Sequence, residues 1–275
     1  MTLPVPSTGG TAVVTGASSG IGAAIARELA SRGHAVRLVA RREQRLLSLA
    51  EELRAAHGVD VGVHACDLCD TAERDRLEVE LARDGRYVEV LVNNAGFGSR
   101  GDFVSNAPSR MLEMVRINVE AVVDLTSRFL PGMVRRGRGA IINVASTAAF
   151  QPLPGAAVYA ASKSFVLSFS EATRTELRGN GVTVTAVCPG PVRTEFTEVA
   201  GMADVAGTTP EAFWSSAGDV AKAAIDGAAE DKRVVVPGAI NQAAAFAGQH
   251  SPRSVALPLI QRFWDAATSR GTSRD

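Results

Sequence analysis

Two polar side chains four residues apart are the clearest candidates for chemistry: Tyr159 and Lys163, in the stretch VYAASK. If this stretch is helical, as its pattern predicts, both side chains lie on one face. A phenol has a pKa of about 10 in water, and a neighbouring ammonium group favours the phenolate. Lys163 would therefore let Tyr159 act as an acid or base near neutral pH, although the same spacing also describes an ordinary pair on a helix surface.

A serine, Ser146, follows the apolar stretch INVA, which has the character of a buried strand. Ligands of open α/β sheets bind at the carboxyl ends of the strands. The hydroxyl of Ser146 is therefore placed to hold a substrate carbonyl oxygen. A serine at the end of a strand can equally be a simple turn residue.

A glycine-rich turn, TGASSGIG at residues 15–22, leaves the first predicted strand and opens the first helix. Gly16 can take the sharp turn, Gly20 lets the backbone approach a pyrophosphate, and Gly22 allows close packing of helix and strand. The start of the helix supplies free N–H groups and the positive end of the helix dipole. The strand–turn–helix context favours a dinucleotide site over a plain turn.

The end of the second predicted strand indicates which dinucleotide binds. An NAD site usually places Asp or Glu there for the ribose 2′-hydroxyl, whereas this chain has Arg41 and Arg42. Two arginines suit a 2′-phosphate, so we predict NADP(H) rather than NAD(H). The alternative is a solvated basic start of the next helix.

The elements that position these residues alternate regularly along the chain. Short β-branched stretches predict strands at residues 11–15, 35–40, 61–65, 88–92, 140–145, 182–187 and 234–236. Helical spacing of apolar residues predicts helices at residues 20–32, 43–56, 71–83, 109–136, 157–178 and 219–229. This alternation predicts a parallel sheet covered on both faces, with right-handed crossovers. Pro131 is expected to end or kink its helix.

Several motifs together resemble the short-chain dehydrogenase/reductase family in its compact single-domain form. The resemblance runs from about residue 11 to residue 194, and each motif falls in the family's order on the expected element. The motifs are TGASSGIG at 15–22, NNAG at 93–96, Asn118 in RINVE, Ser146 in NVAS, YAASK at 159–163 and PGPVRT at 189–194. The resemblance implies an α/β, doubly wound Rossmann fold with a seven-stranded parallel sheet in the order 3-2-1-4-5-6-7.

The resemblance also implies catalytic roles for four residues. Tyr159 would be the proton donor or acceptor, and Lys163 would lower its pKa and hydrogen-bond the nicotinamide ribose. Ser146 would orient and polarise the carbonyl group. Asn118 would hold a water molecule that links Lys163 to solvent as a proton relay.

Cofactor contacts follow from the same resemblance. Arg41 would be the main ligand of the 2′-phosphate, because Ser19 stands where the family often has a second basic residue. Asp67 would bind the adenine amino group, and Thr194 the nicotinamide carboxamide. The whole predicted set is Gly16, Ser18, Ser19, Gly20, Ile21, Gly22, Arg41, Arg42, Asp67, Leu68, Asn94, Ala95, Gly96, Tyr159, Lys163, Pro189, Gly190, Val192 and Thr194.

Composition narrows the class of protein. The 29 basic residues balance 29 acidic ones, so nothing supports a nucleic-acid partner. We see no signal peptide and no apolar stretch long enough for a membrane span. Three cysteines make no disulfide framework, and the pair Cys66 and Cys69 is a weak candidate for redox or zinc chemistry. We expect one domain, residues 1–275, in the cytoplasm.

The substrate is expected to be a small carbonyl or alcohol compound of apolar character. An irregular region at about 190–218 resembles a mobile lid, and apolar side chains from it and from other loops could line a pocket: Phe97, Phe150, Leu153, Phe196, Met202, Phe213 and Trp214. The same side chains could instead simply pack the lid onto the body. The tail at 239–275 contains an apolar stretch that suggests a short helix, which would pack on the body, join a dimer or touch a membrane surface.

Two long helices, at 109–136 and 157–178, resemble those that build dimer interfaces in the family, so we expect a homodimer or homotetramer. The main alternative function is a non-catalytic protein that senses NADP(H) on the same fold. Such proteins often lose the tyrosine or lysine. The complete set of Asn118, Ser146, Tyr159 and Lys163 favours an enzyme.

Overall fold

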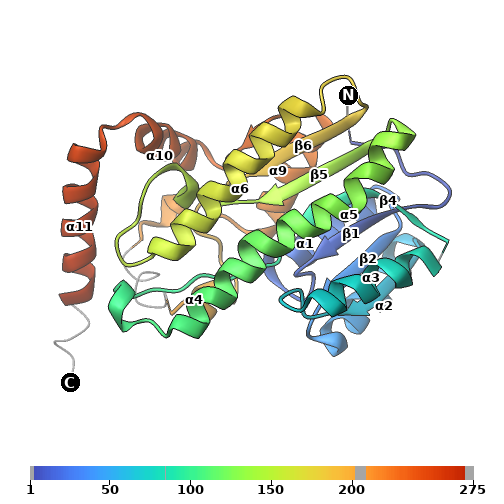
Figure 1. The fold of residues 1–275 in the computed structure, drawn as a ribbon, viewed down its shortest axis with the longest axis horizontal. Coiled ribbons are helices and arrows are strands. Elements are labelled where there is room, and N and C mark those ends of the chain that lie inside the picture. The colour runs from blue at the N-terminus through green and yellow to red at the C-terminus, as the bar shows by residue number, and fades with distance from the viewer. Residues whose placement is uncertain (1–2, 84, 202–208, 270–275) are drawn as a thin grey trace.

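A parallel β-sheet forms the centre of the molecule (Figure 1). The computed structural model describes residues 3–83, 85–201 and 209–269. In these ranges seven strands pair in the order β3-β2-β1-β4-β5-β6-β7, which confirms the predicted topology. The strands are β1 (Gly10–Thr15), β2 (Val36–Ala40), β3 (Val61–Ala65), β4 (Tyr87–Asn93), β5 (Gly139–Val144), β6 (Val182–Val187) and β7 (Val234–Val235).

Helices cover both faces of the sheet because their apolar sides pack against alternate strand residues. On one face lie α1 (Gly20–Ser31), α2 (Glu43–His57) and α9 (Ala217–Ala229), whose buried side chains include Ile25, Leu46 and Ile225. On the other lie α3 (Thr71–Arg83), α5 (Ala121–Arg136) and α6 (Ala157–Glu176). The central strands β1, β5 and β6 are buried along their whole length, as expected for a sheet covered on both sides.

The strand order reverses between β1 and β4, and this is where an open α/β sheet forms its binding crevice. The chain leaves β1 and goes to one side of the sheet, and it leaves β4 and goes to the other. The loops that follow the carboxyl ends of these two strands carry TGASSGIG and NNAG. The fold therefore brings the two motifs together, although about 75 residues separate them.

The long helix predicted at 109–136 differs from expectation in two ways. It begins at α4 (Pro108–Val115), widens into a π-helical turn at Arg116–Glu120, and continues as α5 to Arg136. Pro131 lies inside α5, so of the two expected effects, ending or kinking the helix, the structure excludes the first. Leu125 and Met133, on either side of Pro131, are both fully buried. This packing holds the helix together across the proline.

The C-terminal region is more helical than expected. A short helix α7 (Phe196–Val199) and a 3₁₀ turn (Glu211–Phe213) lie in the predicted lid region. The tail forms α10 (Ala239–His250) and α11 (Arg253–Ser269), and Figure 1 shows α11 standing away from the sheet. The apolar helix expected in the tail corresponds to α11, whereas α10 was not expected. No helix among the described residues is long and apolar enough to cross a membrane.

Candidate active site

Thr15, the last residue of β1, locks the two loops of the crevice together. Its side-chain hydroxyl donates to the carbonyl of Val92 on β4 at 3.0 Å. The same oxygen accepts the backbone N–H groups of Asn94 at 2.9 Å and Ala95 at 3.0 Å. The amide of Asn94 in turn donates to the carbonyl of Thr15 at 2.8 Å. The glycine-rich turn and the NNAG loop thus form one rigid floor.

The glycines of the turn form a cradle that any side chain would fill. Gly16 has φ +66°, and a Cβ there would lie 2.7 Å from the side-chain nitrogen of Asn94. A Cβ at Gly22 would lie 2.4 Å from the carbonyl oxygen of Gly16. Ser19, at the N-cap of α1, makes no side-chain capping bond. The first N–H groups of α1 therefore lack a side-chain cap, an arrangement that suits the pyrophosphate of a dinucleotide.

The two predicted arginines lie at the same end of the crevice but have different contacts. Arg42 donates to the hydroxyl of Ser18 at 3.0 Å and to that of Ser19 at 2.7 Å. Arg41 is 65% exposed and pairs only loosely with Glu113, at 3.7 Å. Both arginines lie where they can reach an anionic group bound beside the glycine-rich turn. Arg42 is the one that is hydrogen-bonded to the turn itself.

Glu195, which the sequence did not single out, ties the lid region to this basic end. Its carboxylate pairs with Arg42 at 2.8 Å and with Arg45 at 2.6 Å. These two hydrogen bonds lower the pKa of Glu195 to about 2, so it carries a full charge at neutral pH. Because about 150 residues separate Glu195 from the two arginines, no local pattern could have indicated the contact.

Helix α6 delivers Tyr159 and Lys163 to the carboxyl end of β5. Both side chains are buried, and the ammonium of Lys163 donates to the carbonyl of Val144 at 2.8 Å. Ser146 follows β5 and interacts with the phenol of Tyr159. Its hydroxyl oxygen also accepts the N–H of Ala148 at 3.1 Å, which starts a short 3₁₀ turn. The structure thus brings three of the four predicted catalytic residues together.

Burial dominates the protonation of both α6 residues. It raises the pKa of Tyr159 to about 12, against a smaller opposing effect of the Ser146 hydroxyl. It lowers the pKa of Lys163 to about 8. The ammonium of Lys163 lies 5.9 Å from the centre of the Tyr159 ring. It is not among the groups that shift the pKa of Tyr159. The expected lowering of the phenol pKa by Lys163 is therefore not seen.

Asn118 lies behind the catalytic residues, in the π-helical turn. Its side-chain amide donates to the carbonyl of Phe97 at 3.0 Å and to the hydroxyl of Ser162 at 2.9 Å, and its oxygen accepts the N–H of Phe97 at 3.2 Å. The side chain is thus used to tie the NNAG loop to α6. π-Helical turns are frequent at functional sites, which agrees with the place of Asn118 behind the catalytic residues.

A single cavity of about 640 Å³ connects these features, a volume typical of small-molecule and cofactor sites. Every predicted cofactor residue lines it except Gly22, which packs behind the turn. Ser146 also lines it. Of the apolar residues expected in the pocket, the described ones all line it: Phe97, Phe150, Leu153, Phe196, Phe213 and Trp214. Met202 lies outside the described residues.

One wall of the cavity comes from the tail, which carries no recognisable motif. Asn241, Ala244 and Ala245 of α10 line the pocket. The buried amide of Asn241 donates to the carbonyls of Phe213 at 3.1 Å and Pro237 at 3.2 Å. It therefore joins α10 to the lid region. Sequence reasoning missed this role, because a lone asparagine in an apolar tail has no spacing that marks it as a lining residue.

The two clustered cysteines lie at the opposite end of the cavity, flanking Asp67 and Leu68. Burial raises the pKa of Cys66 to about 12 and that of Cys69 to about 11, which disfavours the reactive thiolate. Among the described residues, no three His, Cys, Asp or Glu side chains gather as a group that could hold a metal ion. These thiols are therefore lining residues of the cavity.

Hydride exchange with a bound dinucleotide is the chemistry that this cavity suits, since it joins a pyrophosphate cradle to a buried acid–base group. The class so defined is an oxidoreductase acting on CH–OH groups. Comparison with known families agrees. Residues 10–203 match the family described as short chain dehydrogenase, and the chain belongs to that family.

Relatives within the family cover several activities. The chain is 42% identical to a putative ketoacyl reductase of granaticin polyketide synthase from Streptomyces violaceoruber, over 68% of this chain and 69% of that protein. It is 40% identical to the NADP-dependent 3-hydroxy acid dehydrogenase YdfG from Salmonella typhi, over 68% and 75%.

Solved structures resemble it over more of its length. A short-chain dehydrogenase from Sphingobium yanoikuyae in complex with NADPH has a TM-score of 0.78 and 36% identity, covering 86% of this chain and 92% of that one. A bulky-bulky ketone specific alcohol dehydrogenase from Comamonas testosteroni has a TM-score of 0.73 and 31% identity, covering 88% and 95%.

Proposed function

We propose that the protein transfers a hydride reversibly between NADP(H) and a carbonyl/alcohol pair of apolar character. The observation that carries this proposal is one cavity in which the glycine cradle and Arg42 occupy one end and Tyr159 with Ser146 the other. The NADPH and NADP complexes among its structural relatives support this choice of cofactor. The complete catalytic set gives no reason to favour a sensor.

In the reductive direction Tyr159 is the proton donor. Its pKa, raised to about 12, keeps the phenol protonated at neutral pH. The hydroxyl of Ser146 lies beside it and holds the carbonyl oxygen, so the developing negative charge meets two O–H groups. When bound, NADPH supplies the hydride to the carbonyl carbon, and its oxidised ring leaves a positive charge that favours the phenolate.

Lys163 and Asn118 would return a proton from solvent to the phenolate of Tyr159, after the phenol has given its own proton to the product alcohol. Lys163, whose pKa is lowered to about 8, can exchange a proton close to neutral pH. A relay from Lys163 to solvent would pass through a water held by Asn118, whose side chain also binds Phe97 and Ser162.

The substrate is proposed to be a bulky ketone or the matching alcohol. The part of the cavity beside Tyr159 has aromatic and aliphatic walls, with Leu153, Phe196 and Trp214 from three different segments. Such walls bind apolar groups and offer few partners to a charged one. One structural relative is described as specific for bulky-bulky ketones, whereas other relatives are named for acyl, hydroxy-acid or sugar substrates.

The test is binding of NADPH and NADH to the purified protein, followed by NADPH oxidation with a panel of ketones. We expect tighter binding of NADPH and turnover of bulky apolar ketones. Tyr159→Phe should keep NADPH binding and lose at least about 100-fold in kcat. Failure to bind either dinucleotide would refute the proposal, and turnover confined to small charged carbonyls would refute the proposed substrate class.

Two further expectations belong with this function. We propose a cytoplasmic location, where NADPH is available and free thiols such as Cys66 stay reduced. We also propose a homodimer or homotetramer, and the helices that would form it are considered in the Discussion.

A further inference from the structure

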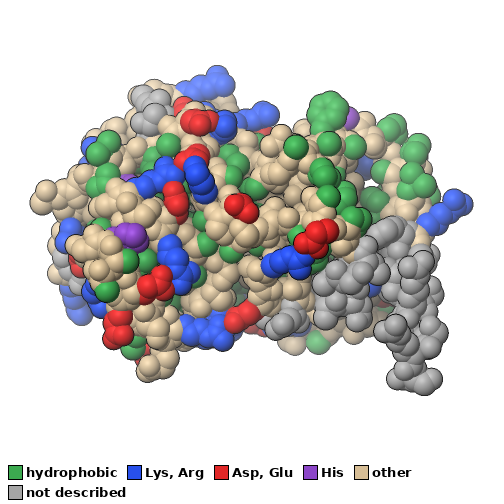
Figure 2. Space-filling model, turned by 180° about the vertical axis from the view of Figure 1, so that it is seen from behind, with side chains coloured by type: hydrophobic (Ala, Val, Ile, Leu, Met, Phe, Trp, Pro, Cys, Tyr) green, Lys and Arg blue, Asp and Glu red, His purple; other side chains and the backbone are tan. Residues whose placement is uncertain are grey.

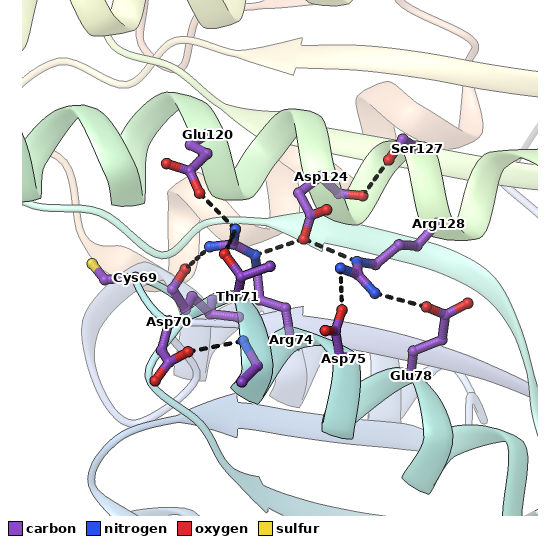
Figure 3. A network of polar contacts seen from close by, with 12 residues as sticks. Cys69, Asp70, Thr71, Arg74, Asp75, Glu78, Glu120, Asp124, Ser127 and Arg128 are labelled. Carbon is purple, nitrogen blue, oxygen red and sulfur yellow. Dashed lines mark hydrogen bonds and ion pairs between the residues drawn. The ribbon is translucent and has the colours of Figure 1, made fainter.

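Arg74, near the start of α3, is buried among polar partners from α3, from the turn before it and from the long helix (Figure 3). Its side chain is only 2% exposed. The guanidinium donates to the carbonyl of Leu68 at 2.5 Å and to the hydroxyl of Thr71 at 3.0 Å. It also binds the carboxylates of Glu120 and Asp124, each at 2.6 Å.

These partners belong to two parts of the active site. The Leu68 carbonyl lies in the turn after β3 that also carries Asp67, and both residues line the cavity. Glu120 lies in the π-helical turn that contains Asn118, and Asp124 follows in α5. Figure 3 shows the guanidinium between the turn and the long helix. Arg74 is therefore a strut between the adenine end of the cavity and the helix behind the catalytic residues.

A contribution to stability does not by itself explain why the charged side chain of Arg74 is buried here. Burial would lower the pKa of Arg74, but the hydrogen bonds that it donates to Glu120 and Asp124 raise that pKa above its ordinary value, so the guanidinium keeps its charge. Replacing a buried ion pair by apolar residues is often neutral or stabilising. A buried arginine that also holds a backbone carbonyl of a binding loop fixes the position of that loop.

We propose that Arg74 is a positioning residue that holds the turn of Asp67 and Leu68 in the geometry that binds the adenine end of the cofactor. The inference rests on the proposed function, because that function places the adenine beside Asp67. The turn depends on this strut because its strong hydrogen bonds, other than those of Arg74, are to residues close in sequence. They include those from the N–H of Cys69 to Asp67 at 3.0 Å and from the N–H of Asp67 to Glu73 at 2.5 Å. The thiol of Cys69 also reaches the carbonyl of Glu113 on α4, but only by a long contact of 3.9 Å.

A matched control lies one helical turn further along the same interface. Arg128 on α5 binds Asp124 at 2.9 Å, Glu78 at 2.8 Å and Asp75 at 2.6 Å. It thus bridges the same two helices with the same kind of ion pairs. These contacts do not include the turn of Asp67 and Leu68, so the loss of Arg128 reports on the packing of α3 against α5 and on the Asp124 carboxylate that the two arginines share.

The experiment compares Arg74→Met with Arg128→Met in steady-state kinetics. Each variant is assayed with NADPH and with reduced nicotinamide mononucleotide, which carries the same reactive ring without the adenosine half. We expect Arg74→Met to lower kcat/KM for NADPH by about tenfold, mainly through KM, because a displaced binding loop loses contacts to the adenine. In Arg74→Met, kcat/KM for the mononucleotide should change less than about twofold. In Arg128→Met, kcat/KM should change neither for NADPH nor for the mononucleotide.

A conservative variant covers the case in which Arg74→Met fails to fold. Arg74→Lys keeps the charge but can reach fewer of the four acceptors, so the ratio of NADPH to mononucleotide kcat/KM should fall part of the way. An unchanged ratio in the folded Arg74 variants, or an equal fall in Arg128→Met, would overturn the inference. If the wild-type protein itself uses both cofactors equally well, the proposed adenine site is wrong instead.

Discussion

At the scale of single residues, burial acts on Tyr159 and Lys163 in opposite directions. It raises the pKa of the phenol to about 12 and lowers that of the ammonium to about 8. In both cases burial favours the neutral form. A neutral phenol is a ready proton donor, which suits reduction, whereas oxidation of an alcohol must first remove the phenol proton.

This leads to a prediction about pH. Because kcat/KM reports the ionisation of the free protein, kcat/KM for alcohol oxidation should rise with pH from 7 towards 10, as the phenolate becomes populated. Reduction should not gain over the same range, because the phenol is already protonated. Initial rates in both directions, in buffers of constant ionic strength, measure this. An oxidation optimum below pH 7 would contradict the role of Tyr159.

Lys163→Met should stabilise the protein at neutral pH. The pKa of Lys163 is about 8 in the folded protein, against an ordinary value of 10.5 for a lysine, so below pH 8 folding buries a charge at a cost. Between pH 8 and pH 10.5 the unfolded chain binds more protons than the folded protein, so the stability of the folded protein rises with pH. Above about pH 10.5 Lys163 is neutral in both states, and the cost of burying its charge is gone. After subtracting the lost bond to Val144, we expect about 1–3 kcal/mol more stability at pH 7.

Urea unfolding at pH 7 and at pH 10.5 tests this expectation, since the gain should vanish at the higher pH. The control is Lys222→Met, because the side chain of Lys222 is 69% exposed and its loss should change stability by less than about 0.5 kcal/mol. Loss of stability in Lys163→Met at pH 7 would show that its contacts outweigh the burial of its charge.

At the scale of elements, the lid region is tied to the cofactor end by one carboxylate. Glu195 occupies Arg42 and Arg45, and the 2′-phosphate of NADPH would need the same positive charge. Glu195→Gln should therefore tighten NADPH binding about two- to fivefold and leave NADH unchanged. Arg42→Ala should weaken NADPH at least about tenfold and NADH little.

Fluorescence titration of both dinucleotides measures these affinities. The matched control is Glu211→Gln, because Glu211 pairs with Arg193 elsewhere in the lid region and its charge does not face Arg42. Equal changes for NADPH and NADH in the Arg42 variant would place the 2′-phosphate somewhere else, with Arg41 as the next candidate.

The regular elements could be predicted from sequence, whereas contacts between distant segments could not. The spacing of apolar residues in strands and helices depends on residues that are close in sequence. The predicted bounds of these elements therefore agree with the structure within a few positions. The π-helical turn contains Asn118, which binds Phe97 and Ser162 in other segments. The Glu195 contact joins residues about 150 positions apart. Such features depend on the assembled fold and leave no local pattern.

Helix α10 is expected to limit substrate size. Ala244 is exposed and lines the cavity, so Ala244→Phe can narrow the site without disturbing the core. We expect kcat/KM to fall about tenfold for a bulky diaryl ketone and less than about twofold for a small methyl ketone. Ala243→Phe, on an exposed position of α10 that does not line the cavity, should change neither. Equal losses for both ketones would argue against α10 as a wall of the substrate site.

At the scale of the whole molecule, charge and apolar surface are unevenly distributed. Figure 2 shows positive and negative side chains intermingled over much of the visible face, and apolar side chains gathered towards the end formed by α10 and α11. Exposed apolar residues there include Ile240, Phe246, Val255 and Leu259. A second apolar set lies on the neighbouring helices α4, α5 and α6: Leu112, Val115, Val123 and Phe165.

The second set predicts where copies of the chain associate. Helices α4 and α6 contact each other, and α5 and α6 run side by side over the same face of the sheet in Figure 1. Pairing this face with a second copy would bury a continuous helical surface, and stable interfaces need about 1,200–2,000 Å². Phe165 is 41% exposed, so Phe165→Asp should place a charge in the interface without disturbing the monomer.

Light scattering coupled to gel filtration, at about 10 µM protein, distinguishes the outcomes, because a homodimer with a Kd below about 1 µM is mostly associated at that concentration. We expect a dimer or tetramer for the wild type and a smaller species for Phe165→Asp. Phe246→Asp, at a 66% exposed position on α10, should leave the assembly intact. If Phe246→Asp dissociates the assembly and Phe165→Asp does not, the interface lies on α10. The second copy would then lie next to Ala244, which lines the cavity. A monomeric wild type would leave the cavity complete within one chain, since each residue proposed for catalysis and cofactor binding comes from that chain.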